Sequence, residues 1–216
     1  MNKTKFKNGV AMFCNLDIIC FTAMCVLRFF RASGGANMQT TGTDCFRYFT
    51  VDSNILLALT SLLALVFNMK SLKSGKEEMP LWVSTCKLIG TTASTVTFLT
   101  VLAFLGPTQG YGKMFEGIGL YLHLINPVLA ILSICFFNGG YKIPAKLACL
   151  GVLPTAVYGA VYAILVVVVK TWEDFYGFAT IIPWYVSIPV MLLFTLGICE
   201  GLNLLRNLCW KKKLNR

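Results

Sequence analysis

The chain has 216 residues, of which 56% are hydrophobic and only 13% charged, and its mean hydropathy is +0.70. Globular domains carry about 25% charged residues, so the composition excludes a disordered tail, a nucleic-acid-binding domain and an ordinary soluble enzyme. The apolar excess is more than one core can bury, which indicates a protein of the lipid bilayer. The net charge of +10 fits lysines that flank membrane spans and face anionic lipid.

Six long apolar runs follow one another along the chain, at residues 9–30, 49–69, 82–105, 118–138, 148–169 and 184–205. Each has about 20 residues, and a helix of that length crosses the ~30 Å hydrocarbon core of a bilayer. The connecting segments are too short to fold as separate domains. The sequence therefore predicts an all-α protein, a single bundle of six transmembrane helices spanning residues 1–216.

Basic residues are concentrated on one side of this predicted bundle. The N-terminal tail, the segments after the second and fourth runs and the C-terminal tail together hold 13 of the 19 Lys and Arg residues. Loops rich in Lys and Arg stay in the cytoplasm during membrane insertion. We therefore predict that both termini are cytoplasmic, which also agrees with an even number of spans.

Ionisable residues inside the apolar runs are candidates for function, because each costs about 2.5–3.5 kcal/mol on insertion scales. Asp17, Lys87 and Glu200, with Asn203 nearby, fall in the half that faces the predicted cytoplasm. One interpretation is a buried cluster of ion pairs. The other is structural, with Lys87 and Glu200 extending their charged ends to the membrane interface.

A second polar group falls near the predicted outer face. Thr50 and Asn54 are four residues apart at the start of the second run and share a helix face, whereas Asp52 projects elsewhere. The fourth run, which crosses the membrane in the same direction, carries the only histidine, His123, three residues before Asn126. Both runs therefore present polar side chains at nearly the same depth.

A threonine hydroxyl is a weak nucleophile unless a base lies within hydrogen-bond reach, and neutral imidazole is such a base near pH 7. Thr50 and His123 are thus a candidate nucleophile and general base, with Asn54, Asn126 and Asp52 as candidate oxyanion-binding or orienting groups. No soluble-type metal or phosphate motif occurs, and we expect neither a metal nor a cofactor. Alternatively, His123 is a structural residue of a packed interior, and Thr50 caps a helix.

Short motifs around these residues resemble a known family. The segment 46–50, Phe-Arg-Tyr-Phe-Thr, is similar to the aromatic-basic-aromatic-aromatic-Thr segment of the androgen-induced/androgen-dependent family of multi-pass membrane hydrolases. His123 followed by Pro127, and Glu-Gly-Leu-Asn at 200–203, resemble further family motifs. Residues 50–54, with Pro154, Tyr158 and Tyr162, look like a pattern of the bacterial relatives.

The family uses a membrane threonine and a histidine to cleave fatty acid esters of hydroxy fatty acids. The resemblance therefore implies catalytic roles for Thr50 and His123, a lipid-like substrate, and a place in the bacterial plasma membrane. The sequence as a whole predicts an intramembrane lipid ester hydrolase with membrane lipids as partners and no nucleic acid. Two other interpretations stay open: a non-catalytic lipid or small-molecule binding or transport protein, and a structural or assembly factor.

Overall fold

The structure is a computed structural model that describes residues 3–31, 41–138 and 141–214, and all regular structure in these ranges is helical. Six helical segments are long and apolar enough to cross a membrane: Thr4–Arg31, Phe49–Ser74, Leu81–Gln109, Ile118–Phe137, Ala145–Val168 and Trp184–Cys209. The prediction of an all-α, six-span membrane protein is confirmed.

Three of the six spans, the third, fourth and fifth, are built from more than one element, because a tighter or a wider turn interrupts the helix. In chain order, the elements are α1 (Lys3–Arg31), η1 (Gly42–Arg47), α2 (Phe49–Ser74), α3 (Leu81–Thr100), η2 (Val101–Leu105), α4 (Gly106–Gln109), α5 (Tyr111–Met114), α6 (Ile118–Leu120), η3 (Tyr121–Ile125), α7 (Asn126–Leu132), η4 (Ser133–Phe137), α8 (Ala145–Ala148), η5 (Cys149–Val152), α9 (Leu153–Ala163), η6 (Ile164–Val168) and α10 (Trp184–Leu214). Here η1 and η5 are 3₁₀ turns, and the other η elements are π turns.

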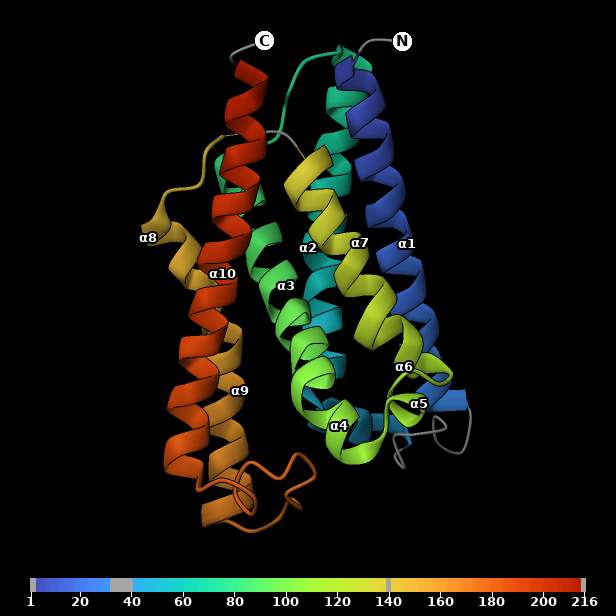
Figure 1. Cartoon of the computed structure of the whole chain (residues 1–216). Coiled ribbons are helices and arrows are strands. Elements are labelled where there is room, and N and C mark those ends of the chain that lie inside the picture. The colour runs from blue at the N-terminus through green and yellow to red at the C-terminus, as the bar shows by residue number, and fades with distance from the viewer. Residues whose placement is uncertain (1–2, 32–40, 139–140, 215–216) are drawn as a thin grey trace.

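The helix α3 forms the centre of the bundle, with α1, α2 and α7 on one side and α9 and α10 on the other (Figure 1). Most of its residues are buried. Its contact with α2 depends on Gly90, since a Cβ atom there would lie 3.1 Å from the Leu57 backbone. Small and hydroxyl-bearing residues let membrane helices approach closely, and the hydroxyls of Thr91 and Thr95 bond to backbone carbonyls of α3 itself.

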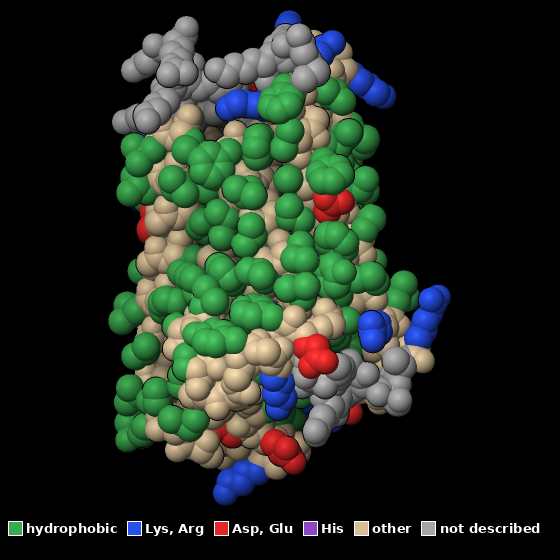
Figure 2. Space-filling view, turned by 45° about the vertical axis from the view of Figure 1, so that its right-hand side comes forward, with side chains coloured by type: hydrophobic (Ala, Val, Ile, Leu, Met, Phe, Trp, Pro, Cys, Tyr) green, Lys and Arg blue, Asp and Glu red, His purple; other side chains and the backbone are tan. Residues whose placement is uncertain are grey.

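Both ends of the described chain lie at the same end of the bundle (Figure 1). Figure 2 shows apolar side chains over the middle of one face, with Lys and Arg gathered toward its two ends. This distribution suits a bilayer-spanning protein. That the terminal end faces the cytoplasm stays a prediction from the charge pattern.

Candidate active site

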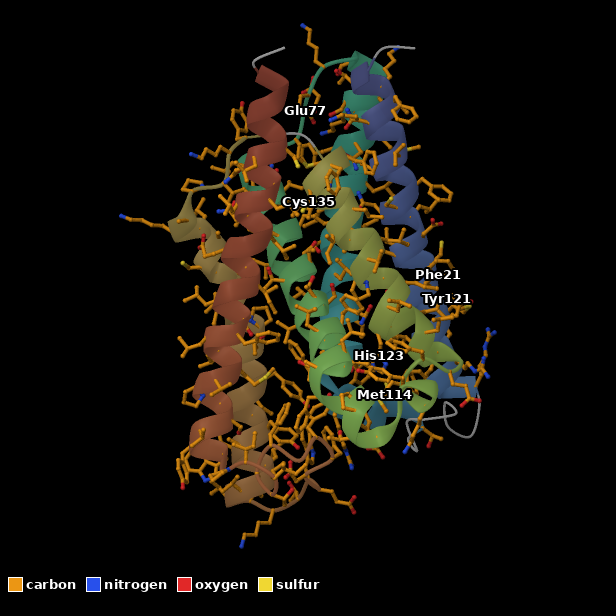
Figure 3. All side chains as sticks on the ribbon, viewed as in Figure 1. Phe21, Glu77, Met114, Tyr121, His123 and Cys135 are labelled. Atoms are coloured by element: carbon orange, nitrogen blue, oxygen red, sulfur yellow. The ribbon has the colours of Figure 1, made fainter. Side chains whose placement is uncertain are left out.

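The polar group predicted near the outer face lies at the end of the bundle opposite the termini. Four segments meet there: the first turn of α2, the π turn η3, the end of α5, and the loop between η6 and α10. His123 and Met114 lie close together at this end in Figure 3. Thr50 and His123 are both buried, with 4% and 6% of their surfaces exposed.

His123 lies in a widened helical turn that Pro127 explains. Proline has no backbone N–H and cannot bond to the preceding turn. In the π turn η3, the Asn126 N–H donates to the Tyr121 carbonyl, five residues back, and leaves the Leu122 carbonyl free. Asn54 of α2 donates to that carbonyl over 3.0 Å. A side chain of α2 thus satisfies the turn that carries His123, and π turns of this kind are frequent at functional sites.

The imidazole of His123 bridges a backbone carbonyl and the Thr50 hydroxyl. Its Nδ1 atom is 2.8 Å from the Met114 carbonyl oxygen, and its Nε2 atom is 3.4 Å from Thr50 Oγ1. A carbonyl oxygen can only accept, so we assign the hydrogen of the neutral ring to Nδ1. The lone pair is then on Nε2, and the Thr50 hydroxyl donates to it. The distance is longer than a tight O–H···N bond, as is common in sites without substrate.

Gly119 allows the Met114 carbonyl to reach His123. Met114 is the last residue of α5, where helix carbonyls have no partner within the helix. A Cβ atom on residue 119 would lie 2.5 Å from the Met114 oxygen and 3.6 Å from His123 Nδ1. Any larger residue at 119 therefore forces this carbonyl to move.

Tyr176 is a member of the site that the sequence reasoning missed. Its hydroxyl accepts a hydrogen bond from the Phe49 N–H over 3.0 Å and also contacts the hydroxyls of Thr50 and Tyr158. Part of the ring is exposed, but protein surrounds the hydroxyl, and this burial raises the pKa of Tyr176 to about 12. The phenol therefore keeps its proton at neutral pH. Tyr176 lies in a loop, where no helical periodicity could have assigned it a direction.

The hydrogen bond from the Phe49 N–H to the Tyr176 hydroxyl also explains how the start of α2 is stabilised. The residue at the N-cap position is Tyr48, and its side chain makes no capping hydrogen bond. Thr50 lies one residue inside the helix, so the alternative in which it caps α2 is wrong. The Tyr176 hydroxyl satisfies the first helical N–H instead.

Asp174 anchors the loop that carries Tyr176. Its carboxylate accepts hydrogen bonds from the Tyr162 hydroxyl at 2.7 Å, from the Ala179 N–H at 2.9 Å, and from the N–H and hydroxyl of Thr180 at 2.7 and 2.8 Å. Burial raises the pKa of Asp174, but these hydrogen bonds outweigh burial and hold it below the usual value. The carboxylate is thus ionised at neutral pH and fixes the loop.

An apolar cavity lies beside Thr50, between α3, α9 and α10. The volume of this cavity, counted as the space that the centre of a water molecule can reach, is about 70 Å³. Thr50, Tyr158 and Tyr176 line it at the site, and Val167 and Leu192 are among its apolar walls. An empty space of this size exceeds what one water needs, about 10–15 Å³ on the same measure. The cavity is therefore suited to part of an apolar chain.

The two candidate oxyanion-binding asparagines are engaged elsewhere. Asn54 donates to the Thr50 and Leu122 carbonyls, and Asn126 donates to the Thr22 hydroxyl and to Asn54 Oδ1. With both donors of each amide occupied, neither points a free N–H at the Thr50 hydroxyl. Their place in the structure is to tie α1, α2 and α7 together below the site.

Asp52 does not join the site. It lies two residues after Thr50, on another face of α2, and lines a separate groove toward α9.

The polar residues predicted in the half of the bundle that holds both termini, the terminal half, are not brought together. Lys87 is fully buried and donates to the Ser61 hydroxyl, whereas Glu200 accepts from the Cys149 thiol at 3.4 Å. Asn203 donates to the Ile143 carbonyl at 3.3 Å. No ion pair joins Asp17, Lys87 and Glu200, all three of which lie in the described part of the chain. A cluster of ion pairs is therefore absent from this set.

No protein-family model, curated protein or solved structure matches the chain. The resemblance of its short motifs to the androgen-induced/androgen-dependent family stays a prediction.

Proposed function

We propose that the protein is an intramembrane lipid ester hydrolase with Thr50 as nucleophile and His123 as general base. The observation that carries the proposal is the chain of contacts from the Thr50 hydroxyl to His123 Nε2 and from Nδ1 to the Met114 carbonyl. Nucleophile, base and orienting acceptor are the three parts that hydroxyl catalysis needs. A backbone carbonyl here takes the orienting role that a carboxylate has in other hydrolases.

In the proposed first step, Thr50 Oγ1 attacks the ester carbonyl carbon while its proton passes to His123 Nε2. The carbonyl oxygen becomes an oxyanion, to which the neutral Tyr176 phenol donates. The C–O bond of the ester then breaks, and the leaving alcohol takes the proton from Nε2. The product of this step is a Thr50 acyl ester and a free alcohol.

The second step repeats this chemistry with water. His123 accepts a proton from a water molecule, whose oxygen attacks the acyl carbon. Collapse of the oxyanion breaks the bond to Thr50 Oγ1, which regains a proton from Nε2. A fatty acid is released and the free enzyme is restored, without an added reductant or oxidant.

The apolar cavity beside Thr50 supports a lipid-like substrate, because its walls can cover an acyl chain but offer few partners to a polar one. We propose that substrates arrive laterally from the outer leaflet, given the predicted orientation. The proposed location, the bacterial plasma membrane, is supported by the motif resemblance to bacterial relatives.

The test is hydrolysis of long-chain esters by the protein in detergent or nanodiscs. Thr50→Ala should abolish turnover, and Thr50→Ser should keep part of it. Thr108→Ala is a matched control, since Thr108 lies at the same end of the bundle and its hydroxyl donates to the Phe104 and Leu105 carbonyls of the preceding turn. Full activity of Thr50→Ala would end the proposal.

A lipid-binding or transport protein without turnover is the second candidate, and the apolar cavity favours it as well. It predicts that the wild type retains long-chain esters unchanged and that His123→Ala weakens their binding. Release of free fatty acid by the wild type, lost in Thr50→Ala, decides against it.

A further inference from the structure

A second hollow, the Asp52 groove, lies between α2 and α9 on the far side of Phe49 and Tyr158 from the cavity at Thr50. Its volume, counted in the same way, is about 400 Å³. Phe49 and Tyr158 line both hollows, and their ring centroids are 5.0 Å apart. The two rings therefore form a wall between the groove and the candidate active site.

Among the residues that line the groove, Asp52 is the one carboxylate. It is partly exposed and, among the described residues, its carboxylate has no hydrogen bond or ion pair. Arg47, five residues earlier, pairs with Asp44 at 2.9 Å. A carboxylate one turn into a membrane span is costly without a partner. In the first turn of α2, the negative charge of Asp52 interacts favourably with the helix dipole. That interaction leaves both oxygen atoms of the carboxylate open to a ligand.

Aromatic side chains make up much of the remaining wall. Phe46, Phe49, Tyr158 and Trp172 come from η1, α2, α9 and the loop after η6. Faces of aromatic rings attract cations, and rings assembled around a carboxylate are a recurrent way to recognise ammonium groups. Aliphatic residues such as Leu56 and Val157 continue the groove along the helices, where an apolar chain can lie.

We propose that the Asp52 groove binds the ammonium head group of a membrane amphiphile, with Asp52 as counter-ion, the aromatic rings around the head group, and the apolar chain along α2 and α9. The charge of the groove and its position at the end of a span both suit this ligand. The proposal does not rest on the proposed hydrolysis, since the groove does not include Thr50 or His123.

The experiment is native mass spectrometry of the purified protein with phosphatidylcholine, phosphatidylethanolamine and phosphatidylglycerol added in equal amounts. The Thr50→Ala variant is used so that no lipid is consumed. We expect the two ammonium lipids to be retained about tenfold over phosphatidylglycerol. Dodecyltrimethylammonium, which has no phosphate, should displace them, and dodecyl maltoside should not.

Two variants connect this preference to the groove. Asp52→Asn should remove the tenfold preference, and Trp172→Leu should weaken retention of phosphatidylcholine more than that of phosphatidylethanolamine. Glu116→Gln is the matched control, since it removes one exposed negative charge at the same end of the bundle. Equal retention of all three lipids by Thr50→Ala overturns the proposal. Loss of the preference in Glu116→Gln to the same extent as in Asp52→Asn also overturns it. If Asp52→Asn does not fold, displacement by dodecyltrimethylammonium still decides.

Discussion

At the end of the bundle opposite the termini, Thr50, His123 and Tyr176 come from three separate segments and meet around one hydroxyl. In the terminal half, Asp17, Lys87 and Glu200 lie on three different helices and do not meet. Thr50 and His123, and the three residues of the terminal half, were predicted as two groups from their depth in the membrane, whereas Tyr176 was not predicted. Depth alone therefore did not decide which polar residues interact, because contact also requires facing helix surfaces and, at His123, a widened turn.

After loss of the nucleophile in Thr50→Ala, the largest effect is expected from His123→Gln, which keeps a polar side chain but removes the base. Turnover should fall by about 10²- to 10⁴-fold, the usual contribution of a positioned general base. The measurement is kcat for a long-chain ester, with thermal unfolding to show that the variant is folded. An unchanged kcat would show that His123 is not a catalytic base, so that the half with Thr50 and His123 would be no more catalytic than the half with the termini.

Tyr176→Phe tests whether the loop contributes chemistry and not only packing. Loss of one oxyanion donor costs about 10²- to 10³-fold in kcat, with little change in KM. Tyr185→Phe is the control, because Tyr185 is 64% exposed at the same end. If kcat is unchanged in Tyr176→Phe, the Tyr176 hydroxyl serves only to accept the hydrogen bond at the start of α2 and does not take part in catalysis.

Gly119→Ala displaces the Met114 carbonyl, whereas its Cβ atom lies at ordinary contact distance, 3.6 Å, from His123 Nδ1. A hydrogen bond is worth about 0.5–1.5 kcal/mol, so we expect a loss of about 2- to 10-fold in kcat. Gly112→Ala is the control, since a Cβ atom there meets nothing within 4 Å. Equal effects of the two substitutions would show that Nδ1 needs no partner at Met114.

Lys87→Met examines the terminal half and should have the smallest effect on activity. Lys87 is buried, and its ammonium group donates to the Ser61 hydroxyl. Burying a charge outside an ion pair is costly, so an apolar chain of similar size at this position should be neutral or stabilising. We expect hydrolysis within about twofold of wild type and no decrease in Tm. A folded variant without activity would make this half part of the function.

The spans could be predicted because twenty apolar residues cross a bilayer in only one common way. The pairing of Thr50 with His123 could be proposed from depth and residue type, but not their contact, which depends on the π turn before Pro127. Tyr176 could not be predicted, since a loop has no periodicity to orient its side chains. The direction of Asp52 followed from its offset to Thr50, whereas the groove that it lines required the packing of α9 against α2.

The most direct test of the central claim is covalent labelling with a fluorophosphonate, located by mass spectrometry of the digested protein. Only a hydroxyl activated by a base reacts readily with such a probe. We predict one adduct, on Thr50, that His123→Gln strongly reduces and that a long-chain ester competes away. An active protein labelled at a different residue, or labelled equally without His123, would contradict the account.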